Sequence, residues 1–409
     1  MVNPKYAGPA GHRQILELGK LLSSPFSGDG VCDGIACTGL AFLVTDEFIT
    51  FEKALATATQ LHMTELRYST LPSYQQVKTR KRAQVYRHLE VSASLLDSIA
   101  INQEPGEFKH LFDESSKESL EQQALNLFTA QKVVISKKIH FYGCYRRESL
   151  KKAVQELQDL VKPLKLQFGF RLETGDHAMA LGRDRDKWLL IDANTLPVKC
   201  SNSEKEITDF IFEAFTFEDE EKTDGFVITV TLYVNANDRQ LIERTLLPWK
   251  NAQHARRFDD HKALSKLEAN RHLYAVLKRH DMEGYFSIKS DPRMNVNAYL
   301  FQAGCTMLYT AAIENNIEMV RILLQHEDID VNLAFGDWTP LYAAIDRGHR
   351  EVVELLLSHS KIDINNCYNG RTALDVANRK SCHEIVSLLR NHEKKDVVNA
   401  SIKKQKMNK

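Results

Sequence analysis

Residues 175–192, GDHAMALGRDRDKWLLID, read as two short apolar strands joined by a charged turn. Residues 178–181 lead into the glycine and charged residues of 182–187, and residues 188–191 lead out of them. Apolar runs that flank a short polar turn are typical of an antiparallel hairpin. We therefore expect a β-hairpin here.

The open end of this hairpin carries a histidine and an aspartate. A turn closed by Gly182 and Trp188 pairs residues whose numbers sum to about 370, so that His177 lies opposite Ala193 and beside Asp192. Neighbouring strands are about 4.8 Å apart, which lets the carboxylate reach the imidazole. The sequence thus predicts a contact between His177 and Asp192. The alternative is a histidine at a strand edge beside a solvated aspartate.

A cysteine far upstream falls at the start of a predicted helix. Residues 23–30 (SSPFSGDG) are rich in turn formers, and residues 35–44 are small and apolar almost all round, as in a buried helix. The N–H groups and the positive dipole end of such a helix lower the pKa of a thiol such as Cys32. They could also donate to an oxyanion. The alternative is a buried structural cysteine, the commonest role of an unpaired thiol, and we expect Cys37 to face the core.

Cys32, His177 and Asp192 together suit nucleophilic catalysis, in which an acid orients a base and the base activates a thiol. His140 and Cys144 form a rival pair at the end of a predicted strand at 132–142. No acid and no helix start accompany that pair, so we rank it below the first.

The order Cys32, His177, Asp192, the G-V-C-D-G block before an apolar helix, and the G-D-H-A strand resemble the papain-like cysteine hydrolases, in particular their YopT-type branch of secreted bacterial effectors. The resemblance covers roughly residues 10–240. It implies an α+β domain with Cys32 as nucleophile, His177 as general base and Asp192 as its orienting group. The papain pattern has a glutamine about six residues before the cysteine as an oxyanion donor. Phe26 stands there in this chain.

The C-terminal part of the chain repeats every 33 residues: Thr306, Thr339 and Thr372 are in register. The middle unit, DWTPLYAAIDRGHREVVELLLSHSKIDIN at 337–365, resembles the ankyrin repeat, and units 304–332 and 370–392 are degenerate copies. Each unit has an apolar face that only a neighbouring unit can bury. We therefore expect an all-α ankyrin solenoid in this region.

The predicted division of the chain has four parts. These are a papain-like cysteine protease-like domain at 1–250, a helical connector or degenerate repeat at 251–300, about three ankyrin repeats at 301–395, and a disordered basic tail at 396–409. In the connector, residues 294–297 (MNVN) could stand in for the exit loop of a divergent repeat.

Composition limits the classes of function. Lys+Arg and Asp+Glu both number 54 in 409 residues, so net charge gives no argument for binding nucleic acid or an anionic membrane. Seven scattered cysteines suit a reducing compartment, and no CxxC or histidine cluster predicts a metal or cofactor. A basic cluster at 78–82 fits anionic lipid, a nuclear-localisation patch or, more simply, a solvated helix face.

The resemblance to ankyrin repeats implies a protein partner. The candidate binding residues lie at the predicted hairpin tips: Trp338, Asp337 and Arg371. A tryptophan exposed there suits a binding anchor, and its alternative is packing against the preceding repeat.

A thiol hydrolase joined to ankyrin repeats resembles the effectors that intracellular bacteria deliver into a host cell by type IV secretion. The expected location is then the host cytoplasm, with the nucleus possible. The expected reaction is cysteine protease-like hydrolysis of a host protein, with deamidation of glutamine or acyl transfer by the same residues left open. The competing expectation is a catalytically silent adaptor whose ankyrin repeats carry the function.

Overall fold

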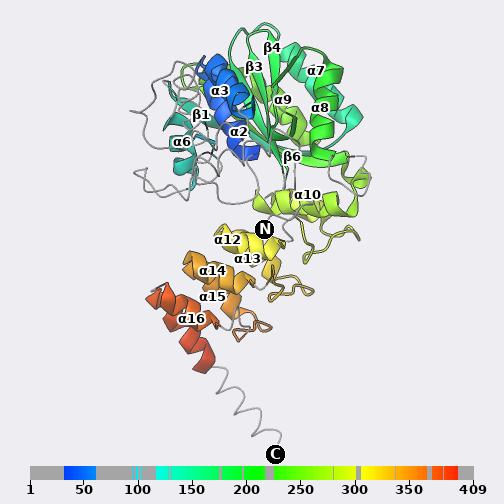
Figure 1. The fold of residues 1–409 in the computed structure, drawn as a ribbon. Coiled ribbons are helices and arrows are strands. Elements are labelled where there is room, and N and C mark those ends of the chain that lie inside the picture. Colours follow the sequence, from blue (N-terminus) through cyan, green and yellow to red (C-terminus); the bar gives the residue numbers. More distant parts are fainter. Residues whose placement is uncertain are drawn as a thin grey trace, which may run out of the picture. The chain divides into compact units, whose positions relative to one another are not determined.

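A computed structural model gives the fold of the chain, which divides by contact density into unit 1, residues 1–263, and unit 2, residues 264–409 (Figure 1). The structure describes residues 32–60, 95, 98–99, 102, 117–127, 129, 131–174, 177–195, 198–216, 225–279, 281–300, 305–336, 338–365, 371–380 and 382–394. Phe26, the basic cluster at 78–82, Asp337 and the predicted tail at 396–409 lie outside these ranges.

Unit 1 is built on one six-stranded antiparallel sheet with the order β1-β6-β2-β3-β4-β5. The strands are β1 (Val133–Arg146), β2 (Phe168–Glu173), β3 (Ala178–Asp184), β4 (Lys187–Ile191), β5 (Lys199–Ser201) and β6 (Gly225–Asn235). The long strand β6 lies between β1 and β2, although it comes last in the chain. The N-terminal region is therefore α+β, with an antiparallel sheet.

Helices cover both faces of this sheet (Figure 1). One face carries α2 (Cys32–Val44), with α3 (Phe48–Gln60) and α6 (Lys117–Leu127) beside it. The other carries α7 (Arg147–Val161), α8 (Glu204–Thr216) and α9 (Arg239–Ala255). Alternate residues of each strand point to opposite faces, so each face has its own apolar core.

Two paired glycines let α2 lie close to the sheet. Gly169 of β2 and Gly182 of β3 are cross-strand partners. A Cβ at Gly169 would clash with Leu40 of α2, and one at Gly182 would clash with Leu43. Larger residues at these positions would push the helix away from the strands.

The central hairpin is present, but the predicted register was wrong by one residue. Ala180 pairs with Ile191, so partner numbers sum to 371, and the turn consists of Arg185 and Asp186 alone. Arg185 has φ +56°, which permits this tight turn. The sequence did not predict this two-residue turn, because a turn position with left-handed backbone is usually occupied by glycine or asparagine.

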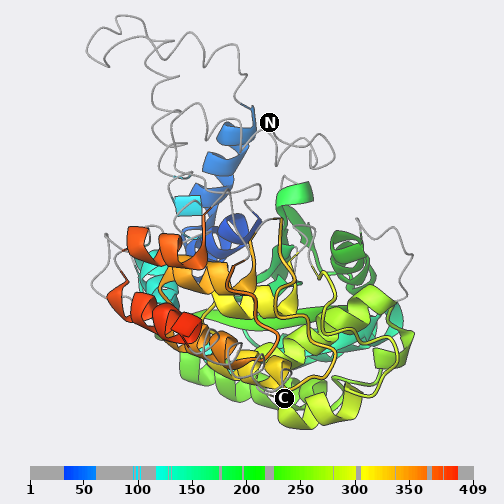
Figure 2. The same ribbon diagram turned by 90° about the horizontal axis from the view of Figure 1, so that it is seen from below.

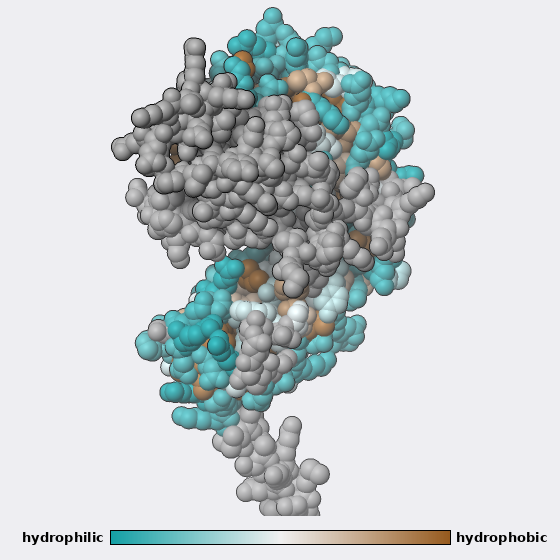
Figure 3. Space-filling model, in the orientation of Figure 1, coloured by the Kyte–Doolittle hydropathy of each residue, from teal (hydrophilic) through white to brown (hydrophobic). Residues whose placement is uncertain are grey.

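Unit 2 is a series of helix pairs stacked in chain order (Figure 1). Figure 2 looks along this stack, so that successive pairs lie one in front of another. The helices are α10 (Lys266–Lys278), α11 (Met282–Ile288), α12 (Met307–Ile313), α13 (Ile317–Leu324), α14 (Pro340–Arg347), α15 (Arg350–Ser358) and α16 (Ala373–Arg379), with a last helix at 383–394. The visible outer surface of these described residues is largely hydrophilic (Figure 3).

The 33-residue period corresponds to a repeated helix start. Thr306, Thr339 and Thr372 are the N-caps of α12, α14 and α16, and each hydroxyl accepts the backbone N–H three residues on. Such a cap satisfies an N–H that the helix itself leaves unpaired. The repeated threonine therefore has a structural reason.

The segment before the three predicted repeats is a further helix pair. Residues 266–278 form the single helix α10, and α11 follows it. Two asparagines, Asn297 and Asn332, bond the following exit loop in the same way. The amide of Asn297 donates to the carbonyl of Asp328 and accepts the N–H of Asp330. The amide of Asn332 donates to the carbonyl of Lys361 and accepts the N–H of Asp363. The MNVN segment thus acts as the exit loop of a first, divergent unit.

No helix among the described residues is both long and apolar enough to cross a membrane.

Candidate functional site

The carboxylate of Asp192 is fixed where β4 ends. Its side chain is fully buried. Oδ1 accepts the backbone N–H of Asn194 at 3.0 Å, and Oδ2 accepts the hydroxyl of Thr195 at 3.1 Å. These donors belong to the short 3₁₀ helix η4 (Ala193–Thr195), which begins directly after Asp192. The strand end and this turn together set the direction of the carboxylate.

His177 lies immediately before β3 and faces Asp192 across the open end of the hairpin. Its Nε2 is 2.8 Å from Oδ1 of Asp192, so the predicted contact is present. A carboxylate only accepts hydrogen bonds, so Nε2 carries the proton and Nδ1 of the neutral ring holds the lone pair. Such a pairing fixes the tautomer of a general base.

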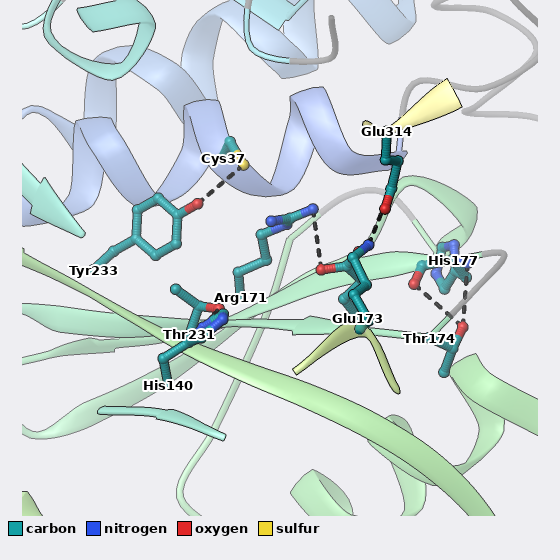
Figure 4. Close-up of polar contacts among 10 residues, drawn as sticks. Cys37, His140, Arg171, Glu173, Thr174, His177, Thr231, Tyr233 and Glu314 are labelled. Carbon is teal, nitrogen blue, oxygen red and sulfur yellow. Dashed lines mark hydrogen bonds and ion pairs between the residues drawn. The ribbon is translucent and has the colours of Figure 1, made fainter. Parts of the chain in front are cut away.

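Two further residues, which the sequence did not single out, hold His177 in place: Thr174 bonds its backbone, and Phe215 contacts its ring. Thr174 closes a turn with it: the N–H of Thr174 donates to the His177 carbonyl at 2.9 Å, and the His177 N–H donates to Oγ1 of Thr174 at 3.2 Å (Figure 4). Phe215 of α8 packs edge-on against the ring, with centroids 5.8 Å apart. Only 11% of the His177 side chain is exposed, so the ring has little freedom to rotate.

Helix α2 runs along the strands toward this pair. A Cβ at Gly39 would touch Ile191, near the open end of the hairpin, whereas Leu43 lies against Gly182, near its turn. The N-terminal end of α2 is therefore directed toward the open end of the hairpin, where His177 lies. The helix also packs against η4, which follows Asp192 directly.

Cys32 is the first residue of α2, so it occupies the end of the helix that is directed toward His177 and Asp192. Its side chain lies outside the described residues, and the expected approach of its Sγ to His177 stays a prediction. Cys37, by contrast, is buried, with its Sγ 3.5 Å from Oη of Tyr233 (Figure 4). It faces the sheet, as we expected from its position on the helix.

The rival pair, His140 and Cys144, is not arranged for catalysis. Burial raises the pKa of the Cys144 thiol to about 12, and the thiol donates to the carbonyl of Arg257 at 3.0 Å. His140 instead bonds Thr231, with Nδ1 2.6 Å from Oγ1. A protonated, buried thiol is a poor nucleophile, which disfavours this pair.

An ion pair lies on the sheet face that α2 covers. Arg171 and Glu173 of β2 are two residues apart, with Nη2 and Oε2 at 3.2 Å. Figure 4 shows both side chains on the α2 side of β2, near Thr174 and His177. The sequence carries no signal for this pair, because any half-buried strand alternates polar with apolar residues in the same way.

The candidate binding residues of unit 2 are only partly described. Trp338 is half-buried and forms an isolated antiparallel β-bridge with Phe335. The N–H of each residue donates to the carbonyl of the other, at 2.8 Å from Phe335 and 2.9 Å from Trp338. Gly336, at the tip, has φ +58°. Arg371 is exposed, and its carbonyl accepts the hydroxyl of Tyr342. Asp337 lies outside the described residues.

Within the described residues, no group of three or more His, Cys, Asp or Glu side chains is placed to hold a metal ion. The arrangement of His177 and Asp192 suits acid–base chemistry by protein side chains.

Comparison with known families identifies the C-terminal region. The family model of ankyrin repeats (3 copies) matches residues 263–366 and 328–400. The C-terminal region contains ankyrin repeats. The match begins at residue 263 and so includes α10 and α11, within the segment predicted as a connector or degenerate repeat. No curated protein matches the chain.

Ankyrin repeats generally mediate protein–protein interactions, so the ankyrin region indicates a protein partner.

Proposed function

We propose that unit 1 is a cysteine hydrolase whose target is selected by the ankyrin repeats. The observation that carries this proposal is the contact of 2.8 Å between His177 Nε2 and the buried, doubly anchored carboxylate of Asp192. The N-terminus of α2 points toward the end of the sheet that holds this oriented imidazole. A Cys–His–Asp triad requires such an arrangement.

In this proposal Cys32 is the nucleophile. Nδ1 of His177 takes the thiol proton, and the thiolate attacks a carbonyl carbon of the substrate. The imidazolium, stabilised by Asp192, then returns the proton to the departing amine, which leaves a thioester on Cys32. Water deprotonated by His177 hydrolyses the thioester, releases the carboxylic acid and restores the thiol. A peptide bond and a glutamine side chain can pass through all of these steps. In acyl transfer the thioester forms in the same way, and an acceptor amine or hydroxyl deprotonated by His177 then replaces water and takes the acyl group from Cys32.

The ankyrin repeats would supply recognition. A partner bound by unit 2 is tethered to unit 1, which raises the effective concentration of its reactive group. The candidate anchors are Trp338, Asp337 and Arg371.

The rate of Cys32 alkylation as a function of pH tests the triad. Iodoacetamide labelling, followed by mass spectrometry, should give a Cys32 rate that is already high well below pH 8.5, the ordinary thiol pKa. His177→Ala should shift this profile upward toward that value, and Asp192→Asn should do so in part. An ordinary profile for Cys32 in the unaltered protein would rule out an activated nucleophile.

Capture of the substrate follows from the same site. A Cys32→Ser protein should retain its target in a pull-down, since it binds without completing the reaction. The bound protein is then incubated with the unaltered enzyme, and mass spectrometry of the product distinguishes cleavage, deamidation and acyl transfer.

A second candidate function is a silent adaptor, and it is favoured by the replacement of the papain-pattern glutamine with Phe26. The two candidates differ in the effect of paired variants in cells. If the enzyme reading holds, Cys32→Ala keeps the partner and loses the effect, whereas Trp338→Ala with Arg371→Ala loses the partner and leaves Cys32 labelling unchanged. A full effect of the Cys32→Ala protein would establish the adaptor.

We further propose, on the resemblance alone, that the protein is a bacterial effector delivered into host cells by type IV secretion. A fusion to a reporter enzyme that is active only in host cytoplasm tests delivery. The reporter signal should vanish in a bacterial strain that lacks the secretion system.

A further inference from the structure

The ion pair of Arg171 and Glu173 has no role in the steps above, yet it lies beside the candidate catalytic histidine. Gly169, Arg171 and Glu173 alternate along β2 with Phe168, Phe170 and Leu172, which belong to the core on the opposite face. Because Gly169 packs against Leu40 of α2, the ion pair lies on the α2 face as well.

The strand register places Glu173 next to His177. Glu173 is the cross-strand partner of Ala178, the residue that follows His177, and on its other side it pairs with Thr229. Partners on adjacent antiparallel strands have Cα atoms about 5 Å apart.

Glu173 shares the α2 face with Ala178, whereas His177, one residue earlier, is directed toward α8, where its ring meets Phe215. The two groups thus flank the end of the sheet. A substrate side chain one or two residues from a carbonyl held between Cys32 and His177 can reach the carboxylate, since an extended chain advances about 3.4 Å per residue.

The neighbours of the ion pair on β3 are small. Ala178 is the partner of Glu173, and Ala180 is the partner of Arg171. An alanine leaves the charged heads accessible where a larger side chain would cover them. Of the two, Glu173 is the more accessible, with 30% of its side chain exposed against 17% for Arg171. Arg171 thus holds and orients the carboxylate, and Glu173 is the group that a ligand meets first.

We propose that Glu173, oriented by Arg171, selects substrates that carry a cationic side chain, lysine or arginine, within two residues of the attacked carbonyl. This inference rests on the proposed hydrolase function and names its substrate class. A half-buried carboxylate binds an ammonium or guanidinium group by charge-assisted hydrogen bonds, which are stronger than those between neutral groups. An anionic side chain at the same place meets like charge and is rejected.

Peptide chloromethyl ketones that differ only in charge test this inference on the full-length protein. Three reagents carry lysine, norleucine or glutamate at the two residues next to the electrophile, and iodoacetamide serves as a reagent without a peptide. The rate of Cys32 labelling by each is measured by mass spectrometry. We expect the lysine reagent to react about tenfold faster than the norleucine reagent, the factor that one charge-assisted hydrogen bond contributes. The glutamate reagent should be slowest.

Variants then assign the preference to the carboxylate. Glu173→Gln should bring the lysine and norleucine rates together while leaving the iodoacetamide rate unchanged, and Glu173→Lys should favour the glutamate reagent. Glu148→Gln is the matched control, because Glu148 is exposed in the first turn of α7, which covers the opposite face of the sheet. It should leave the preference intact.

The outcomes separate the two proposals. If Cys32 reacts rapidly with all three peptides and shows no charge preference, or if the preference survives Glu173→Gln, the assignment of Glu173 is overturned and the hydrolase stands. If Cys32 reacts no faster with iodoacetamide than an ordinary thiol does, the hydrolase itself fails, and the specificity site fails with it.

Discussion

Leu356 of the ankyrin stack offers the most direct test of how unit 2 is held together. It lies on α15, which packs against α13 of the preceding pair and α14 of its own, and its side chain is fully buried, as is that of Ala344 on α14. Both residues belong to the apolar face that, from the repeat pattern, each unit was expected to bury against its neighbour, and their burial agrees with that expectation. Leu356→Ala should therefore remove packing between neighbouring units.

The size of the effect follows from this burial. The substitution removes the branch beyond Cβ, and at roughly 0.8 kcal/mol for each buried carbon the transfer contribution is about 2.4 kcal/mol. The cavity that remains brings the loss in free energy of unfolding to about 3–5 kcal/mol. Leu355 is the matched control, since it is the preceding residue and only half-buried. Leu355→Ala should cost about 1 kcal/mol.

The three tryptophans allow the two units to be followed separately. Trp188 and Trp249 belong to unit 1, and Trp338 belongs to unit 2. Guanidinium unfolding of a Trp338→Phe protein, followed by fluorescence, reports unit 1, and the difference from the unaltered protein reports unit 2. Leu356→Ala should lower the midpoint for unit 2 and leave that for unit 1 in place.

Two results would refute this reasoning. Equal losses for Leu356→Ala and Leu355→Ala would mean that burial between units does not set the stability of the stack. A common transition, shifted equally in both fluorescence signals, would mean that the two units unfold as one.

Three further predictions concern single residues. Thr339→Ala removes the cap that accepts the N–H of Tyr342; it should lower the unfolding free energy of unit 2 by about 1 kcal/mol in the same assay, and no change would show that the cap is dispensable. Gly169→Ala should destabilise unit 1 by about 1–3 kcal/mol, because the added Cβ meets Leu40; a neutral result would mean that α2 can move. Cys144 should escape alkylation at pH 9 in the folded protein and react in denaturant, because burial raises its pKa to about 12. Its protonated thiol favours folding below the ordinary pKa, an advantage lost as pH rises toward 12; ready labelling of folded protein at pH 9 would contradict the burial.

Local patterns in the sequence predicted the ankyrin region and the contact at the hairpin. The caps at Thr306, Thr339 and Thr372 depend on residues only three positions away, so the 33-residue period seen in the sequence coincides with the helix starts. His177 and Asp192 are the two ends of one hairpin. Their proximity depends on the turn between them, and it survived the one-residue error in register because both lie at the open end.

Tertiary structure decided the rest of the candidate site. Phe215 comes from α8 and packs on His177, and Glu173 acquires its place only through pairing with β3 and β6. The sequence did not indicate the turn at Arg185, because arginine seldom adopts the positive φ that this residue has. Spacing along the chain fixes what a helix or a hairpin does within itself. Which strands become neighbours, and which side chains therefore surround the histidine, depends on burying both faces of the sheet at once, and no local pattern contains that information.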